Sequence, residues 1–270
     1  MMNKTVLWIV IGLVVIGGLI FMITNNQSNL NGSLQVVGST SVQPLAEELA
    51  QEFIAQNQGI QIAVQGGGSG AGIKAASDGT AEIGNSSREL KAEEKGLYET
   101  VIARDGIAIV VNKENQVTNL SFEQLQKIYT GEYTNWKQVG GPDLAVVVVN
   151  REAGSGTRGA FEEIVLQKLQ NTNQGLVQAS TGAVQQTISV TKEAIGYISL
   201  GSLDQESVKT VTIDGIECNA VNILAGDYKV QRPFLMLTKE EPTGLVKTFL
   251  DWVTGPEGQK IVAGDFIPVK

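Results

Sequence analysis

Histidine is absent from all 270 residues of this chain. Its absence removes Ser-His-Asp and Cys-His catalysis and leaves any metal site to carboxylates alone. Cys218 is the single cysteine, so no internal disulfide can form, and we expect a small buried residue there. The chain has no lysine- or arginine-rich run and a formal net charge of −8, which argues against nucleic acid as a partner. No cofactor or metal is expected.

One long apolar run stands at the beginning of the chain. Residues 6–23 carry no charge, and Lys4 is the only charged residue before them. At about 1.5 Å per residue, such a helix nearly spans the hydrocarbon core of a membrane. We therefore expect an uncleaved transmembrane anchor, with residues 1–5 in the cytoplasm and the rest of the chain outside it. A cleaved signal peptide is the alternative. The polar, Asn-rich residues 24–32 are expected to form a flexible tether.

Three short turns rich in Gly, Ser and Thr each precede a segment with helical spacing of apolar residues. They are Gly38–Ser41, Gly66–Gly70 and Gly154–Thr157. A helix start leaves backbone N–H groups unpaired, and hydroxyl side chains add further donors for an anion. Arg151 precedes the third turn by three residues, and its guanidinium can hold an oxyanion with two N–H groups. Three such turns, if they converge, would enclose a small oxyanion.

Strand and helix signals alternate along the chain, which predicts an α/β fold with mainly parallel strands. The polar stretch 112–119 interrupts this pattern and marks a first crossing between domains, and residues 229–237 are expected to cross back to the first domain. We therefore expect a discontinuous first domain (33–111 plus 233–270), an inserted second domain (112–232) and a ligand cleft between them. Trp136 and Tyr197 are expected in the core. Strands are expected at 34–37, 60–64, 81–84, 106–111, 145–149, 195–198 and 208–213, and helices at 42–56, 72–77, 91–96, 122–129, 159–169, 181–190, 243–253 and 258–262.

The ordered motifs resemble the PstS family of phosphate-binding proteins, which deliver phosphate to an ABC importer. The matching segments are 37–45, 66–74, 83–90, 151–158, 194–199 and 266–268. The resemblance implies a two-domain fold of the type II periplasmic-binding-protein class that closes on phosphate. It also implies permease subunits of the importer as partners, and we expect a monomer.

By position, the resemblance assigns phosphate binding to a defined set of residues. Ser87 stands where many relatives have an aspartate that accepts the proton of hydrogenphosphate and repels sulfate. That rejection of sulfate is therefore weaker here or depends on another residue. Arg88 supplies either a second positive group or a surface ion pair. The implied set is Thr40, Ser41, Ser69, Ser87, Arg151, Ser155, Gly156 and Thr157, with Ser39, Gly70 and Arg88 as possible additions.

Other functions remain open from the sequence. The chain would also suit a receptor for another tetrahedral oxyanion, such as sulfate or molybdate, or a sensory or adhesive ectodomain of the same fold. An enzyme acting on phosphate esters is disfavoured, because the sequence offers no histidine, metal cluster or activated nucleophile for that chemistry.

Overall fold

The computed structural model describes residues 31–172 and 174–269. The expected anchor at 6–23 and the tether up to residue 30 lie outside these residues. Within the described residues, no helix has both the length and the apolar character needed to cross a bilayer.

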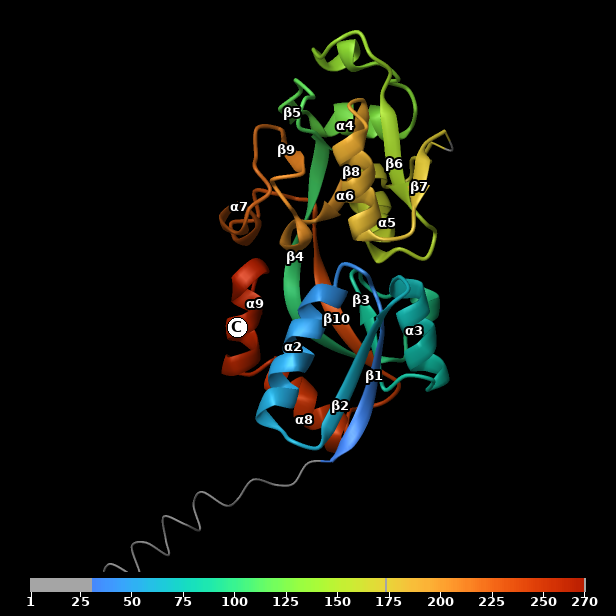
Figure 1. Cartoon of the computed structure of the whole chain (residues 1–270). Helices are drawn as coiled ribbons and strands as arrows, with labels where there is room; N and C mark the ends of the chain where they lie inside the picture. The colour runs from blue at the N-terminus through green and yellow to red at the C-terminus, as the bar shows by residue number, and fades with distance from the viewer. Residues whose placement is uncertain (1–30, 173, 270) are drawn as a thin grey trace, which may run out of the picture.

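One hydrophobic cluster lies around five strands in the order β2-β1-β3-β10-β4. Phe234 and Met236 of β10 face the cluster with helix α2, whereas Leu235 and Leu237 face helix α3, because successive strand residues point to opposite sides. Helices α2, α8 and α9 thus cover one face of the sheet and α3 the other (Figure 1). We call this part the first lobe. Its elements are β1 (Gly32–Gly38), α2 (Gln43–Gln56), β2 (Ile60–Gly66), α3 (Ser69–Asp78), β3 (Ile83–Ser86), β10 (Gln231–Thr238), α8 (Gly244–Val253) and α9 (Pro256–Asp265).

A second hydrophobic cluster contains Trp136 and Tyr197, as expected, and also Cys218. Tyr197 stacks on Phe161 with ring centroids 4.2 Å apart. We call this part the second lobe; it occupies the opposite end of the molecule (Figure 1). Its elements are β5 (Asn119–Leu120), α4 (Phe122–Tyr129), β6 (Val147–Arg151), α5 (Gly156–Phe161), β7 (Leu176–Gln178), α6 (Thr181–Val190), β8 (Ala194–Ser199), β9 (Val208–Ile213) and α7 (Ala220–Leu224).

Two antiparallel strands connect the lobes. Strand β4 (Tyr98–Asn112) pairs with β10, with a register shift between Phe234 and Leu235. Residues 107–111 of β4 pack in the second cluster, so β4 contributes to both lobes. Asp105 and Arg232 face each other at this crossing and form an ion pair of 2.9 Å in which both side chains are 1% exposed. The Ser199 hydroxyl donates to the second oxygen of Asp105 at 2.9 Å.

Three expectations about local structure were wrong. The sheet is mixed rather than mainly parallel, because β4 and β10 run antiparallel to their neighbours β8 and β3. The expected helix at 91–96 is only a 3-10 turn at Ala92–Glu94, since the Glu94 carboxylate accepts from the Lys91 N–H and closes the turn. The expected helix at 159–169 consists of α5 followed by a π turn at Glu162–Leu166.

The buried ion pair at the crossing yields a stability prediction. Asp105→Ala should lower the free energy of unfolding by about 3–5 kcal/mol, because it leaves the Arg232 guanidinium buried without its counter-charge. Asp251→Ala is the matched control, since Asp251 forms an exposed pair with Lys247 on α8, and it should leave the free energy of unfolding nearly unchanged. Urea unfolding followed by circular dichroism measures both. Equal losses for the two variants would contradict the prediction.

Candidate functional site

The turn after β1 and the end of β3 bring three serines of the first lobe together. The Ser39 hydroxyl donates to the Ser87 hydroxyl at 2.8 Å, and the Ser87 N–H donates to the Ser69 hydroxyl at 3.0 Å. The hydroxyls of Ser69 and Ser87 are 3.4 Å apart. All three side chains are buried. Two of the three predicted turns therefore converge within the first lobe.

Close contact between α3 and the sheet makes this convergence possible. A Cβ at Gly72 would lie 2.6 Å from the Val37 carbonyl oxygen, and one at Gly84 would lie 2.2 Å from the Gly72 carbonyl oxygen. Real Cβ atoms do not approach other heavy atoms so closely, so both positions require glycine for this packing. The start of α3, and with it Ser69, can lie beside Ser87 for this reason.

Arg151 comes from the carboxyl end of β6 in the second lobe and is 1% exposed. The Tyr197 hydroxyl accepts the Arg151 backbone N–H at 3.3 Å. The guanidinium donates to both carboxylate oxygens of Glu152, each at 3.0 Å, and to the Gln178 carbonyl oxygen at 3.1 Å. Glu152 thus balances part of the charge and fixes the orientation of the guanidinium.

Several hydrogen bonds join the two lobes at this place. The Ser41 hydroxyl lies 2.9 Å from the Thr157 hydroxyl, and Arg151 Nη2 donates to Thr40 Oγ1 at 3.2 Å. The Gly70 N–H donates to the Gly154 carbonyl oxygen at 3.0 Å. All three predicted turns therefore meet between the lobes. We use the name hydroxyl cluster for Ser39, Thr40, Ser41, Ser69, Ser87, Thr157 and Thr181.

The remaining predicted residues lie next to the cluster in different roles. Gly156 lies against Ser69 and Ser87: a Cβ there would be 2.1 Å from Ser69 Oγ and 2.6 Å from Ser87 Oγ. The Ser155 oxygen accepts the Arg158 N–H at 3.2 Å and caps α5. Gly70 contributes the backbone contact between the lobes described above.

Arg88 forms an ion pair, but the pair is not at the surface. Its guanidinium donates to both oxygens of Glu94, at 2.6 and 2.7 Å, and its side chain is 8% exposed. The hydrogen bond from Arg88 lowers the pKa of Glu94 below its usual value. Within the described residues, the Arg88 guanidinium makes no hydrogen bond to the hydroxyl cluster, so the alternative of an ion pair fits better than that of a second positive group in the site.

Two residues of the site were missed by the sequence analysis. Glu152, which pairs with Arg151, lay inside the matching segment 151–158 but received no role of its own. Thr181 is 3% exposed, lies 2.9 Å from the Ser41 hydroxyl and accepts from Arg151 Nη1 at 3.4 Å. The signal for Thr181 was present, because Ser180-Thr181-Gly182 is a further Ser/Thr/Gly turn that opens a helix.

The site offers an excess of hydrogen-bond donors. Seven hydroxyl groups share four hydroxyl–hydroxyl contacts, and each contact uses one hydrogen, so at least three hydroxyl hydrogens stay available for another acceptor. Burial raises the pKa of the neighbouring Tyr197 phenol, which therefore stays neutral. A neutral set of donors around one guanidinium suits the binding of a small oxyanion.

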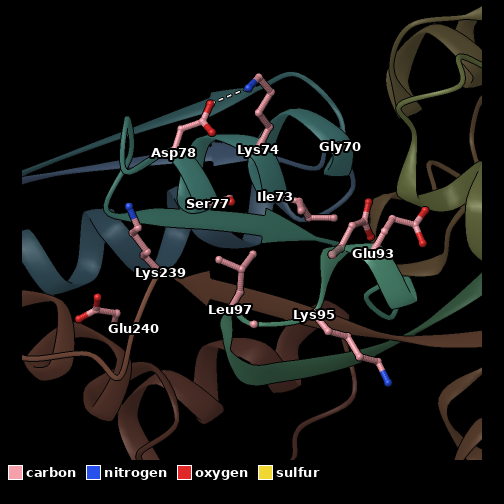
Figure 2. Close-up of a pocket in the computed structure, with 12 residues that line it drawn as sticks. Gly70, Ile73, Lys74, Ser77, Asp78, Glu93, Lys95, Leu97, Lys239 and Glu240 are labelled. Carbon is pink, nitrogen blue, oxygen red and sulfur yellow. Dashed lines mark hydrogen bonds and ion pairs between the residues drawn. The ribbon is translucent and has the colours of Figure 1, made fainter.

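The two hollows beside the site differ from it in character. One hollow, of about 710 Å³, lies on the α3 side of the first lobe. Figure 2 shows its lining, in which Lys74 and Asp78 form an exposed pair and lysines and carboxylates are mixed. Its charges do not converge on one point. A hollow of about 440 Å³ is lined by residues of both lobes, among them Lys91 and Lys95 of the first and Ser155, Glu162 and Glu163 of the second. It mixes charges of both signs like the first hollow, and no residue of the hydroxyl cluster lines it.

Known proteins support the assignment of the fold and of the family. The family model described as a PBP superfamily domain matches residues 24–257. The phosphate-binding protein PstS of Bacillus subtilis is 36% identical over 251 residues, covering 90% of this chain and 83% of the relative. PstS of Borreliella burgdorferi is 31% identical, covering 90% and 94%.

Solved structures agree with these relatives. A putative phosphate ABC transporter substrate-binding protein of Clostridium perfringens, solved with bound phosphate, has a TM-score of 0.85 and 44% sequence identity. The match covers 88% of this chain and all of that one. An ABC-type phosphate transport receptor of Vibrio cholerae has a TM-score of 0.73 and 36% identity, with coverage of 88% and 100%. The chain belongs to the PBP superfamily and, within it, to the PstS family of phosphate-binding proteins.

Proposed function

We propose that this chain captures inorganic phosphate between its two lobes and delivers it to the permease subunits of an ABC importer. The observation that carries the proposal is the contact of Ser41 with Thr157 beside the buried Arg151, because it places donors from both lobes around one cation. The names of the relatives and of the phosphate-bound neighbour support the choice of anion. The proposed ligand residues are Thr40, Ser41, Ser69, Ser87, Arg151, Ser155, Gly156 and Thr157.

Energies agree with such a site. A hydrogen bond to a charged group contributes about 1.5–3 kcal/mol, whereas micromolar affinity needs only about 8 kcal/mol in total. Several such hydrogen bonds together exceed about 8 kcal/mol. The excess free energy offsets the dehydration of phosphate and the ordering of the two lobes, so closure is coupled to binding.

Burial favours a free anion over an ester. Ser41, Ser69 and Ser87 have no exposed side-chain surface, and Arg151 and Thr157 are 1% exposed. An organic substituent on one phosphate oxygen would meet these buried side chains. The family is one of solute-binding proteins, and we propose that this member catalyses nothing; release of phosphate from a phosphomonoester above background would contradict that.

The proposal includes the arrangement of the chain. We propose that the two domains correspond to the two lobes, with the expected ranges 33–111 plus 233–270 and 112–232, except that residues 107–111 belong to the second domain. Residues 6–23 would anchor them outside the cytoplasm through the tether 24–32, or would be removed as a signal peptide.

A growth experiment separates the transport receptor from the alternative of a sensory or adhesive ectodomain. If the chain is such an ectodomain, deleting its gene should leave growth on scarce phosphate unchanged, whereas deleting a transport receptor should give poor growth.

Removal of the Arg151 side chain tests the function. Arg151→Ala should weaken phosphate binding about 100- to 1,000-fold, because the anion would lose the single cation among its proposed ligands and Glu152 would lose its partner. Arg104→Ala, which removes an exposed arginine, should bind phosphate like the wild type. Isothermal titration calorimetry with inorganic phosphate measures both.

The same titration, repeated in the presence of sulfate or molybdate, decides between the oxyanions. Ser87 offers a hydroxyl where a carboxylate would repel a fully deprotonated anion, so sulfate is the most informative competitor. Tighter binding of sulfate or molybdate than of phosphate would overturn the choice of ligand, and unchanged affinity of Arg151→Ala would overturn the site.

Gly156 gives an independent steric test. Gly156→Ala should weaken phosphate binding at least about 100-fold, because its methyl group would collide with the hydroxyls of Ser69 and Ser87 and keep the lobes apart. Gly182→Ala on α6 is the control, since a Cβ there meets no atom within 4 Å. Calorimetry measures affinity and small-angle scattering measures compactness with phosphate present. A Gly156→Ala protein that closes and binds normally would refute the proposed packing.

A further inference from the structure

We propose that Thr181 is an additional ligand-contacting residue and that α6 is a fourth helix start of the site. This inference rests on the proposed function, since it concerns the binding of the same anion. The sequence resemblance assigned no role to Thr181.

The local structure at the start of α6 presents Thr181 to the site. Ser180 is the N-cap, and its side chain accepts from the Ala183 N–H at 3.1 Å, which leaves Thr181 as the first helical residue. Its backbone N–H belongs to the first turn, where no intrahelical acceptor exists, and lies 3.4 Å from Thr40 Oγ1. Both donors of Thr181 therefore lie close to hydroxyl cluster residues of the first lobe.

The hydroxyl groups of Ser41, Thr157 and Thr181 have more hydrogens than their mutual contacts use. Ser41 contacts both Thr157 and Thr181, at 2.9 Å each, so three hydroxyls share two contacts. At least one of their three hydrogens has no acceptor among these three residues. Arg151 Nη1 donates to Thr181 Oγ1, so the oxygen of Thr181 already accepts and its hydrogen can point to an anion beside the guanidinium.

The position of α6 links this donor to lobe closure. Val184 and Ile188 of α6 are buried in the second cluster, so the helix moves with the second lobe. Its contact with Ser41, in contrast, reaches the first lobe. Thr181 would therefore meet the ligand only when the lobes come together, at the same time as Thr157.

Thr181→Val removes the hydroxyl at nearly constant volume. We expect its Kd for inorganic phosphate to rise about 10- to 100-fold, equivalent to about 1.4–2.8 kcal/mol at 1.4 kcal/mol per tenfold change. Thr181→Ser, which keeps the hydroxyl, should remain within about threefold of the wild type. Thr187→Val is the matched control: its hydroxyl donates to the Ala183 carbonyl oxygen on the same helix at 2.8 Å, and its Kd should not change.

Thermal unfolding with and without phosphate separates binding from folding. A ligand contact predicts that adding phosphate raises the Tm of Thr181→Val by less than it raises the Tm of Thr181→Ser, whatever the Tm of each variant without phosphate. If that variant does not fold, Thr181→Ala replaces it in the same comparison with Thr181→Ser. Affinity of the hydroxyl-free variant equal to that of Thr187→Val would overturn the role of Thr181, whereas a wild type that fails to bind phosphate would overturn the proposed function itself.

Discussion

The buried guanidinium of Arg151 is the constraint on which the site depends. A guanidinium cannot lose its charge in a protein and presents five N–H donors, so its burial demands acceptors on several sides. Glu152, Gln178 and Thr181 supply acceptors from the second lobe, and Thr40 supplies one from the first. When the lobes close, the Arg151 guanidinium gains the hydrogen bond to Thr40, so closure helps to satisfy this buried cation.

Hydroxyl groups suit such a place better than further charges would. A second arginine or lysine would repel Arg151 in a medium of low dielectric constant, whereas a serine or threonine donates a hydrogen bond at little electrostatic cost. The structure follows this rule, because Arg88 is neutralised by Glu94 instead of facing the cluster. Charge at the site is confined to Arg151 and its partner Glu152, and neutral donors such as Ser41 and Thr157 complete the enclosure.

The sequence predicted the helix starts better than the sheet. The turns with Ser41, Ser69 and Thr157 were recognised because capping and glycine signals are local, and the fold class followed from the alternation of elements. The antiparallel path of β4 was not recognised, since pairing with β10 joins segments more than a hundred residues apart. The Arg88–Glu94 pair depends on three-dimensional packing. Thr181, by contrast, carried a local signal that was read only as a helix.

The crossing strands determine how the lobes can move. Strands β4 and β10 are neighbours in one antiparallel ladder, with register shifts confined to a single point. At the crossing the two segments stay side by side, because the Ile107 N–H donates to the Val230 carbonyl oxygen at 2.8 Å. Moving one lobe along the strands would stretch both backbones, whereas bending at the crossing leaves the ladder intact. The lobes therefore move relative to each other mainly by bending at this crossing. An ion held between the lobes needs to fix only the angle of that bend to hold the whole molecule in one shape.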